Sequence, residues 1–332
     1  MMERININGI IEKFKYVLKQ HELGTGQYCR FLWQDALETR KMGLNAYGCA
    51  DAANIMYTLG ELPRNTAVRE NFINTLQNLQ NPKTGLFLEL SHHIIHTTAH
   101  CVAALELFDE RPRYPLYELE QYRDIERFFA WMEREDWLHR GRMAHPGAGL
   151  FAAMFITESI DDAWVEKYFN WFDKTCDKET GLWVSRPVEN FPVHLQMGDA
   201  FHYLFNYEYM KRPFPYPEQL IDSCLEMYNN GQMPESFGKD FHFIEMDWVY
   251  CLNRASRQTP YRFAEIKETL SFFAERYIEY LKSVDYETNE GANDLHLLFG
   301  TLCCLSELQL ALPGKIISSK PLRLVLDRRP FI

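Results

Sequence analysis

Apolar side chains recur along most of the chain at the three- and four-residue spacing of amphipathic helices, and alternating Val/Ile-rich runs are nearly absent. Strongly apolar segments alternate with longer amphipathic ones, and turns marked by Gly or Pro separate them. The pattern predicts an all-α fold. The predicted helices cover residues 5–20, 27–40, 46–59, 67–80, 97–108, 117–133, 146–158, 162–176, 195–210, 218–229, 245–255, 261–284 and 293–312.

The helical pattern repeats with a period of 49 residues. Successive apolar segments start at or just after residues that are 49 positions apart. These residues are Tyr47, His96, His145, His194, Phe243 and Ala292. A turn repeats as well, because the sequence NPKTGLF at 81–87 returns as DKETGLW at 177–183. We expect the Thr and Gly of these turns to be structural. A period of this length is typical of stacked units that cannot bury their apolar faces alone.

The repeat predicts a single (α/α)6 toroid domain over residues 1–332, built from six helical hairpins in two concentric rings. The repeats occupy 43–314, the N-terminal helices in 1–42 close the ring, and 315–332 form a C-terminal tail. All inner helices of such a toroid run in the same direction. Their N-termini and the loops before them therefore meet at one mouth.

The residues that this arrangement brings to the mouth are mostly histidines, carboxylates and aromatic rings. On the helices or at their starts they are Tyr47, Asp51, His96, His100, His145, His194, Asp199, His202, His242, Glu245, Asp247, Trp248, Tyr250, Asp294 and His296. The preceding loops add Phe87, His92, His93, Trp183, Arg186 and Phe191. Aromatic rings stack on the apolar faces of sugars, so this mixture suits a small carbohydrate better than a polyprenyl chain.

The amino-acid composition argues against some classes of binding partner. The chain has 46 acidic and 35 basic residues and a net charge of −11, which argues against nucleic acids and anionic membranes. No apolar run reaches the roughly 18 to 20 residues that span a bilayer, and the first residues lack the pattern of a signal peptide. We expect a cytoplasmic protein. The eight cysteines form no CxxC pair and are expected to be buried free thiols.

Residues 43–314 resemble the (α/α)6 toroid superfamilies: the six-hairpin glycosidases with the related N-acylglucosamine 2-epimerase type, and the terpenoid cyclase and protein prenyltransferase toroids. The segment FPVHLQMGDAFHYL at 191–204 is similar to the epimerase-type segment in which a histidine precedes an inner helix that carries a carboxylate. This resemblance implies catalytic positions for His194 and Asp199.

A second motif resembles the zinc ligands of protein prenyltransferases, which are an Asp, a Cys and a His. The matching residues are Asp247 and Cys251 in the sequence DWVYC, and His296 in the sequence DLH. The resemblance implies a zinc ion bound by these three side chains.

Carboxylates in apolar surroundings are the best catalytic candidates, because burying such a group is costly unless it faces a polar cavity or a partner. Asp199 and Asp247 both lie in apolar helices. Two carboxylates across a cavity suit glycoside hydrolysis, where one protonates the leaving oxygen and the other activates water or attacks. We predict these two as the acid/base pair, with His96, His194 and Tyr250 orienting the substrate. Asp51 and Asp294 are rivals for either role.

The histidines allow other chemistries. His96 and His100 share one helix face and, with His145 and His194, are candidates for a metal site. Alternatively, these histidines only bond free backbone groups at helix starts. The leading hypothesis is a glycoside hydrolase acting on short oligosaccharides without a required cofactor, with zinc as an option. The alternatives are a polysaccharide lyase or sugar epimerase using histidine and tyrosine, a zinc-dependent prenyltransferase or terpene cyclase-like enzyme, and a non-catalytic toroid that binds a sugar or a protein.

Overall fold

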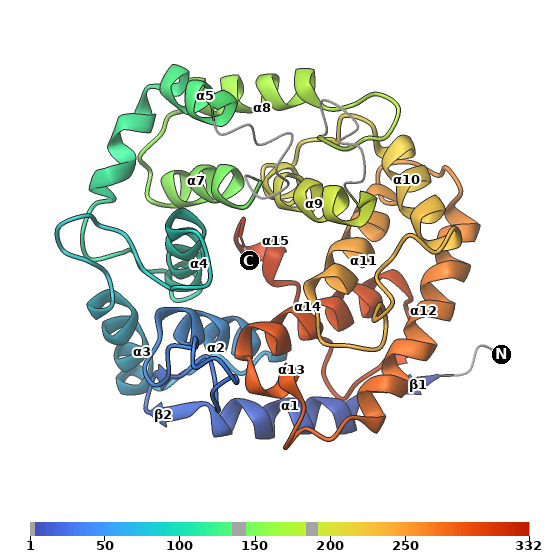
Figure 1. Cartoon of the computed structure of the whole chain (residues 1–332), viewed down its shortest axis with the longest axis horizontal. Helices are drawn as coiled ribbons and strands as arrows, with labels where there is room; N and C mark the ends of the chain where they lie inside the picture. Colours follow the sequence, from blue (N-terminus) through green and yellow to red (C-terminus); the bar gives the residue numbers. More distant parts are fainter. Residues whose placement is uncertain (1–3, 135–143, 184–191, 332) are drawn as a thin grey trace. The chain divides into compact units, whose positions relative to one another are not determined.

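A computed structural model describes residues 4–134, 144–183 and 192–331. Helices make up most of this part of the chain, and its four strands are only two or three residues long, so the all-α prediction is confirmed (Figure 1). No helix within the described ranges is both long and apolar enough to cross a membrane. All eight cysteines are free and buried, as predicted.

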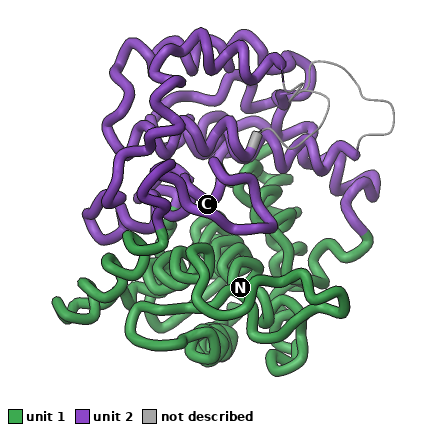
Figure 2. The backbone as a smooth tube through the Cα atoms, turned by 60° about the vertical axis from the view of Figure 1, so that its left-hand side comes forward, with its two compact units in different colours: residues 1–79, 235–253, 262–325 green, residues 80–234, 254–261, 326–332 purple. Residues whose placement is uncertain are grey.

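The chain divides into two compact units (Figure 2). Unit 1 comprises residues 1–79, 235–253 and 262–325. Unit 2 comprises residues 80–234, 254–261 and 326–332.

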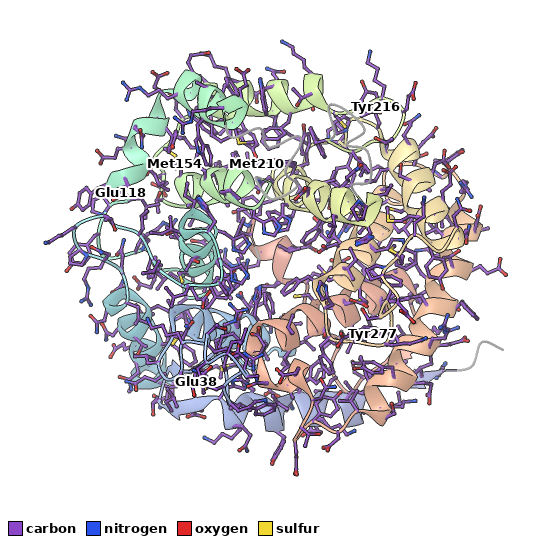
Figure 3. The ribbon with its side chains drawn as sticks, in the orientation of Figure 1. Glu38, Glu118, Met154, Met210, Tyr216 and Tyr277 are labelled. Carbon is purple, nitrogen blue, oxygen red and sulfur yellow. The ribbon has the colours of Figure 1, made fainter. Side chains whose placement is uncertain are left out.

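Unit 1 is built around a pair of nearly fully buried helices, α2 (Ala46–Leu59) and α14 (Leu295–Ala311), which pack against each other. Helix α3 (Thr66–Asn78) packs on α2, and α12 (Phe263–Ser283) packs on α14. Tyr277 of α12, labelled in Figure 3, is fully buried, and its hydroxyl donates to Thr301 Oγ1 of α14 at 3.3 Å. The unit also contains α1 (Asn8–Gln20), α13 (Glu290–Asn293) and most of α11 (Phe243–Ala255).

Of the two strand pairs that the structure describes in unit 1, one joins distant parts of the chain and the other joins neighbouring segments. Strand β1 (Ile5–Asn6) pairs in parallel with β4 (Ile316–Ile317), and β2 (Glu22–Gly24) pairs antiparallel with β3 (Gln27–Tyr28). Helix α1 packs on α12, which gives the N-terminal helix an amphipathic neighbour within the unit.

Unit 2 has a row of three apolar helices, in which α4 (Ile94–Glu106) packs on α7 (Ala144–Ile156) and α7 packs on α9 (Val193–Tyr209). The amphipathic elements of this unit are η1 (Tyr117–Arg123), α5 (Ile125–Arg134), α8 (Asp162–Thr175) and α10 (Pro217–Asn229). Helix α5 packs on α8, and α10 packs on α9. The short helix α15 (Val325–Arg328) leads into the last residues of the unit.

The two copies of the repeated turn in unit 2 share one hydrogen-bond pattern. Asn81 Oδ1 accepts from the backbone N–H groups of residues 83 and 84, and Asp177 Oδ1 accepts from those of 179 and 180. Each turn ends on a glycine with positive φ, 76° at Gly85 and 69° at Gly181. A Cβ at Gly85 would lie 1.9 Å from the carbonyl oxygen of Pro115. The turns are therefore structural, as predicted.

Three predicted elements differ from the structure. Residues 27–40 are not a helix, because their backbone bonds go elsewhere: Leu32 N–H donates to Asn293 O, and Trp33 N–H donates to Asn293 Oδ1. The helix predicted over 117–133 is broken at Asp124, which is extended between η1 and α5. The helix predicted over 293–312 is interrupted at Asp294, which caps α14.

Most other boundaries agree to within three residues. Helix α2 covers the predicted range, whereas α4, α7, α9 and α11 begin two or three residues early. At α4 the reason is a side-chain cap, because His93 Nδ1 accepts from Ile95 N–H at 3.2 Å.

Candidate functional site

Three histidines of unit 2 converge from the three packed apolar helices. His96 lies on α4, His145 in the first turn of α7, and His202 on α9. One ring nitrogen from each of the three lies within 4.8 Å of those of the other two. The rings of His145 and His202 are stacked with centroids 3.8 Å apart, and the ring of His96 lies 5.2 Å from that of His145. We call these three residues the histidine cluster.

The histidine cluster is nearly enclosed. His96 is 3 % exposed and His202 is 7 % exposed, while His145 is half-buried. The ring of Phe331 closes one side, in a T-shaped contact with the His96 ring at 4.8 Å. Burial, together with the neighbouring histidines, holds the pKa of His96 well below its ordinary value of 6.5. Its ring is therefore neutral at pH 7, which is the form that binds metal ions.

A backbone contact fixes the tautomer of His202. Its Nδ1 lies 2.7 Å from the carbonyl oxygen of Gly198, and a carbonyl oxygen can only accept. Nδ1 therefore carries the proton, and Nε2 has the lone pair that a metal ion needs. Metal-binding histidines are commonly oriented in this way by an acceptor on the other ring nitrogen.

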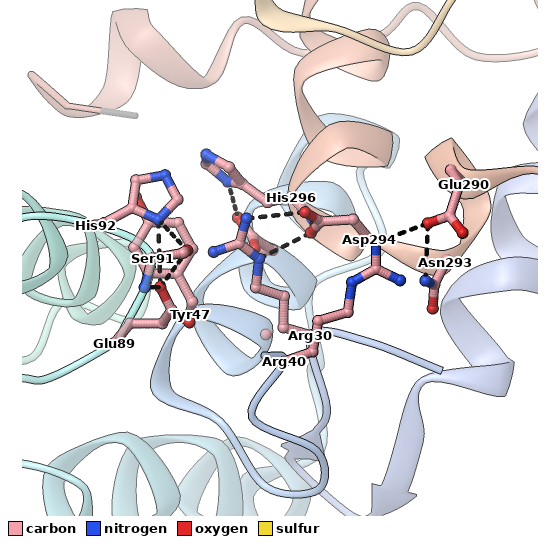
Figure 4. A network of polar contacts seen from close by, with 12 residues as sticks. Arg30, Arg40, Tyr47, Glu89, Ser91, His92, Glu290, Asn293, Asp294 and His296 are labelled. Carbon is pink, nitrogen blue, oxygen red and sulfur yellow. Dashed lines mark hydrogen bonds and ion pairs between the residues drawn. The ribbon is translucent and has the colours of Figure 1, made fainter. Parts of the chain in front are cut away.

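A fourth histidine, His92, lies beside the cluster in the loop before α4. Its ring is stacked on that of His96 with centroids 5.2 Å apart, but it is not one of the three residues whose nitrogens converge. Its Nδ1 lies 2.9 Å from Ser91 Oγ and 3.3 Å from Glu89 Oε2 (Figure 4). The Glu89 carboxylate is 2 % exposed and also accepts from the backbone N–H and the hydroxyl of Ser91.

Unit 1 contains a second polar group, around His296 on α14. His296 Nδ1 lies 2.9 Å from Asp51 Oδ1 of α2, and both side chains are buried. The rings of Tyr47 and Phe243 contact the imidazole, with centroids 4.7 Å and 4.3 Å away. A carboxylate that orients an imidazole is the arrangement of general acid/base pairs.

Asp294 has a structural role next to this pair. Its carboxylate receives two hydrogen bonds from the Arg30 guanidinium, at 2.9 Å and 2.8 Å, and one from the backbone N–H of His296 (Figure 4). The residue thus caps α14 and ties it to the segment before α2.

Glu245, in the first turn of α11, is the buried carboxylate with the clearest electrostatic signature. Its Oε1 accepts from Gly238 N–H at 2.8 Å, whereas Oε2 has no hydrogen-bond partner among the described residues. Burial raises the pKa of this carboxyl from 4.5 to about 8. Glu245 is therefore mostly protonated at neutral pH.

The predicted acid/base carboxylates lie in different units. Asp199 is half-buried on α9 in unit 2, and Asp247 is 6 % exposed on α11 in unit 1. His194 lies at the start of α9, where its Nδ1 is 3.0 Å from the carbonyl oxygen of Gln232 and not in the histidine cluster. The pairing of Asp199 with Asp247 stays a prediction.

The aromatic residues predicted to contact a substrate are core residues. Trp183 is 4 % exposed and its indole N–H donates to the carbonyl oxygen of Phe172 at 2.9 Å. Trp248 is fully buried against Phe273, and Tyr250 is also fully buried. His100, one turn beyond His96 on α4, is fully buried as well. Arg186 and Phe191 lie outside the described residues.

The zinc ligands implied by the prenyltransferase resemblance do not assemble. Within the described part of the chain, no group of convergent ligand atoms contains Asp247, Cys251 and His296 together. His296 instead pairs with Asp51.

Sequence reasoning placed the histidines near helix starts but missed the residues that orient them. Glu89 lies three residues before His92 in an irregular loop, so helical periodicity gave no signal for it. Phe331 is in the predicted tail, and nothing in the sequence connects it with His96.

No protein-family model, curated protein or solved structure matches this chain.

Proposed function

We propose that this chain is a metal-dependent hydrolase, with a zinc ion bound by His96, His145 and His202. The observation that carries the proposal is the convergence of three ring nitrogens within 4.8 Å of one another, from three different helices. Tetrahedral zinc with Zn–N bonds of about 2.0–2.1 Å needs nitrogens about 3.3 Å apart. The stacked rings of His145 and His202 would have to rotate against each other for their nitrogens to reach that separation and point at one ion.

Three histidine ligands leave one position of a tetrahedral zinc site open, which is the pattern of catalytic zinc. The metal would lower the pKa of a water molecule bound there and supply a hydroxide nucleophile near neutral pH. A zinc ion held by His96, His145 and His202 would therefore supply chemistry suited to the hydrolysis of carbonyl or phosphoryl compounds.

This chemistry limits which carbohydrates, the substrate class implied by the six-hairpin resemblance, are expected as substrates. A metal-bound hydroxide suits the removal of an acyl or phosphoryl substituent from a sugar better than cleavage of the glycosidic bond, which proceeds through an oxocarbenium-like transition state. Acylated and phosphorylated sugars are therefore the first substrates to test.

Metal binding is tested on protein purified without a metal-affinity tag, stripped with a chelator and titrated with Zn²⁺ against a chromophoric competitor. We expect one equivalent of zinc and a loss of affinity of at least about 100-fold in His96→Ala and His202→Ala. His242→Ala is the matched control, because this histidine of unit 1 accepts from Ile244 N–H at the start of α11 and is not part of the histidine cluster. Wild-type protein that binds no zinc, or cluster variants that bind it like wild type, would overturn the proposal.

A second candidate function is proton transfer by the Asp51–His296 pair, as in the lyase or epimerase alternative. It is supported by the 2.9 Å contact between the carboxylate and the imidazole, with Tyr47 against the same ring. Activity that survives complete metal removal but is lost in Asp51→Asn would favour this function over the metal-dependent one.

We also propose that the hairpins close into the (α/α)6 toroid and that the protein is cytoplasmic. The 49-residue repeat and the shared geometry of the turns at 81–87 and 177–183 support the toroid, and eight free thiols support the location. A closed toroid of this length should have a radius of gyration of about 20 Å in small-angle scattering, whereas an open solenoid would be larger.

A further inference from the structure

We propose that His92, oriented by Glu89, hydrogen-bonds whatever group occupies the fourth position of the metal centre. This inference rests on the proposed metal site at the histidine cluster. It assigns a role to two residues that are outside the set of ligands.

The geometry separates His92 from the metal ligands. Its ring is stacked on that of His96 with an interplanar angle of 19°, so it is adjacent to the centre. The nitrogens of His96, His145 and His202 converge within 4.8 Å, whereas His92 is not in that group. His92 therefore lies against one member of the cluster without being one of the three converging ligands. In the proposed arrangement, a group bound to the metal lies between the cluster and His92.

The contacts of Nδ1 determine which nitrogen His92 presents. Nδ1 lies 2.9 Å from Ser91 Oγ, which donates its hydrogen to Glu89, and 3.3 Å from Glu89 Oε2, which can only accept, so Nδ1 carries a hydrogen. In the neutral ring, Nε2 is then the nitrogen that accepts. An accepting Nε2 suits a metal-bound group that carries a hydrogen, such as water, a hydroxyl or an amide N–H.

Glu89 is a positioning residue in this arrangement. Its carboxylate is 2 % exposed and is fixed by the backbone N–H of Ser91 at 2.8 Å and the Ser91 hydroxyl at 2.5 Å. The His92 side chain is 21 % exposed, so it lies between the buried carboxylate and solvent.

The test uses full-length protein loaded with Co²⁺, whose visible spectrum reports the ligands of the metal, and two probes that bind metals. Acetohydroxamate carries an N–H that can donate to His92, whereas azide carries no hydrogen. We expect the affinities of His92→Ala for Co²⁺ and for azide to stay within about threefold of the wild-type values. Its affinity for acetohydroxamate should be about tenfold lower than that of wild type. Glu89→Gln should lower the affinity for acetohydroxamate by a smaller factor than His92→Ala does.

His92→Gln provides a second variant, because its side-chain oxygen can accept a hydrogen bond and should restore part of the acetohydroxamate affinity. His242→Ala should leave both probes unchanged. A large loss of Co²⁺ affinity in His92→Ala would make this residue a metal ligand and overturn the inference, as would equal effects on both probes. Failure of wild-type protein to bind Co²⁺ would instead overturn the metal site itself.

Discussion

His202 donates its Nδ1 hydrogen to the carbonyl oxygen of Gly198, one turn earlier on the same helix, across 2.7 Å. A glycine at that position leaves no side chain beside the imidazole, and the helix backbone itself selects the tautomer. The nitrogen of His202 that would bind the proposed metal ion is thus left with its lone pair by a backbone contact rather than by a neighbouring side chain.

This contact predicts the protonation pattern of His202 in solution. Because Nδ1–H is fixed by a carbonyl oxygen, we expect the Nδ1–H tautomer both before and after zinc is added. Long-range 1H–15N spectra of 15N-histidine-labelled protein, assigned with His202→Gln, measure this directly. On zinc binding only the Nε2 resonance of His202 should shift strongly. A spectrum with Nε2 protonated would contradict the proposed ligand set.

The buried pair in unit 1 predicts a loss of stability. In Asp51→Asn the amide oxygen can still accept from His296, but the charge-assisted part of the bond is lost. We expect the free energy of unfolding to fall by about 1–3 kcal/mol, measured by urea denaturation.

A control for the buried pair is Glu279→Gln, which breaks an exposed ion pair with Lys282. It should change the free energy of unfolding by no more than about 0.5 kcal/mol. Equal effects of Asp51→Asn and Glu279→Gln would show that the buried contact contributes nothing specific.

Glu245 predicts how stability depends on pH. Its pKa is raised from 4.5 to about 8 in the folded protein, so between these values the folded state holds a proton that the unfolded state has released. The contribution of Glu245 to stability is therefore fully present below pH 4.5 and is lost as pH rises toward 8. In Glu245→Gln this loss should be absent.

The comparison of wild type with Glu245→Gln is made by urea denaturation at pH 5, 7 and 9. From pH 5 to pH 9, the free energy of unfolding of Glu245→Gln should rise relative to that of wild type by up to a few kcal/mol. Parallel stability curves for the two proteins would show that Glu245 is solvated or paired in solution.

The repeated turns predict the cost of replacing a glycine. Gly85→Ala combines a φ of 76° with a Cβ placed 1.9 Å from Pro115 O, whereas Gly231→Ala has a φ of 66° and nothing within 4 Å of its Cβ. We expect a loss of about 1 kcal/mol for Gly231→Ala and at least about 3 kcal/mol for Gly85→Ala, from thermal unfolding. Similar losses would show that Pro115 moves aside without cost.

The sequence predicted the helices whose stability comes from their own apolar faces. Helix α2 has the predicted bounds because Asn45 caps it and Gly60 ends it in the left-handed conformation, and both signals are local. The helix predicted over residues 27–40 is wrong for the opposite reason. Its backbone bonds depend on Asn293, more than 250 residues away, and no local pattern encodes that contact.

In the candidate site, too, the sequence predicted what depends on local pattern and missed what depends on distant contacts. The 49-residue step located His96 and His145 because both are near the start of a repeated helix. His202 lies further along α9, and only packing of α9 on α7 brings its ring to 3.8 Å from that of His145. The role of Glu89 depends on loop geometry, which periodicity does not report.

The pairing of β1 with β4 has a consequence for synthesis on the ribosome. Ile5 pairs with Ile316, and Asn8 Oδ1 accepts from Ser319 N–H across 311 residues. Strand β1 and Asn8 are therefore synthesised about 311 residues before their partners, while residues 80–234 emerge as one continuous stretch of unit 2. Nascent chains stalled before residue 263 lack α12, on which α1 packs, and should expose the apolar face of α1 to chaperones, whereas released chains should not.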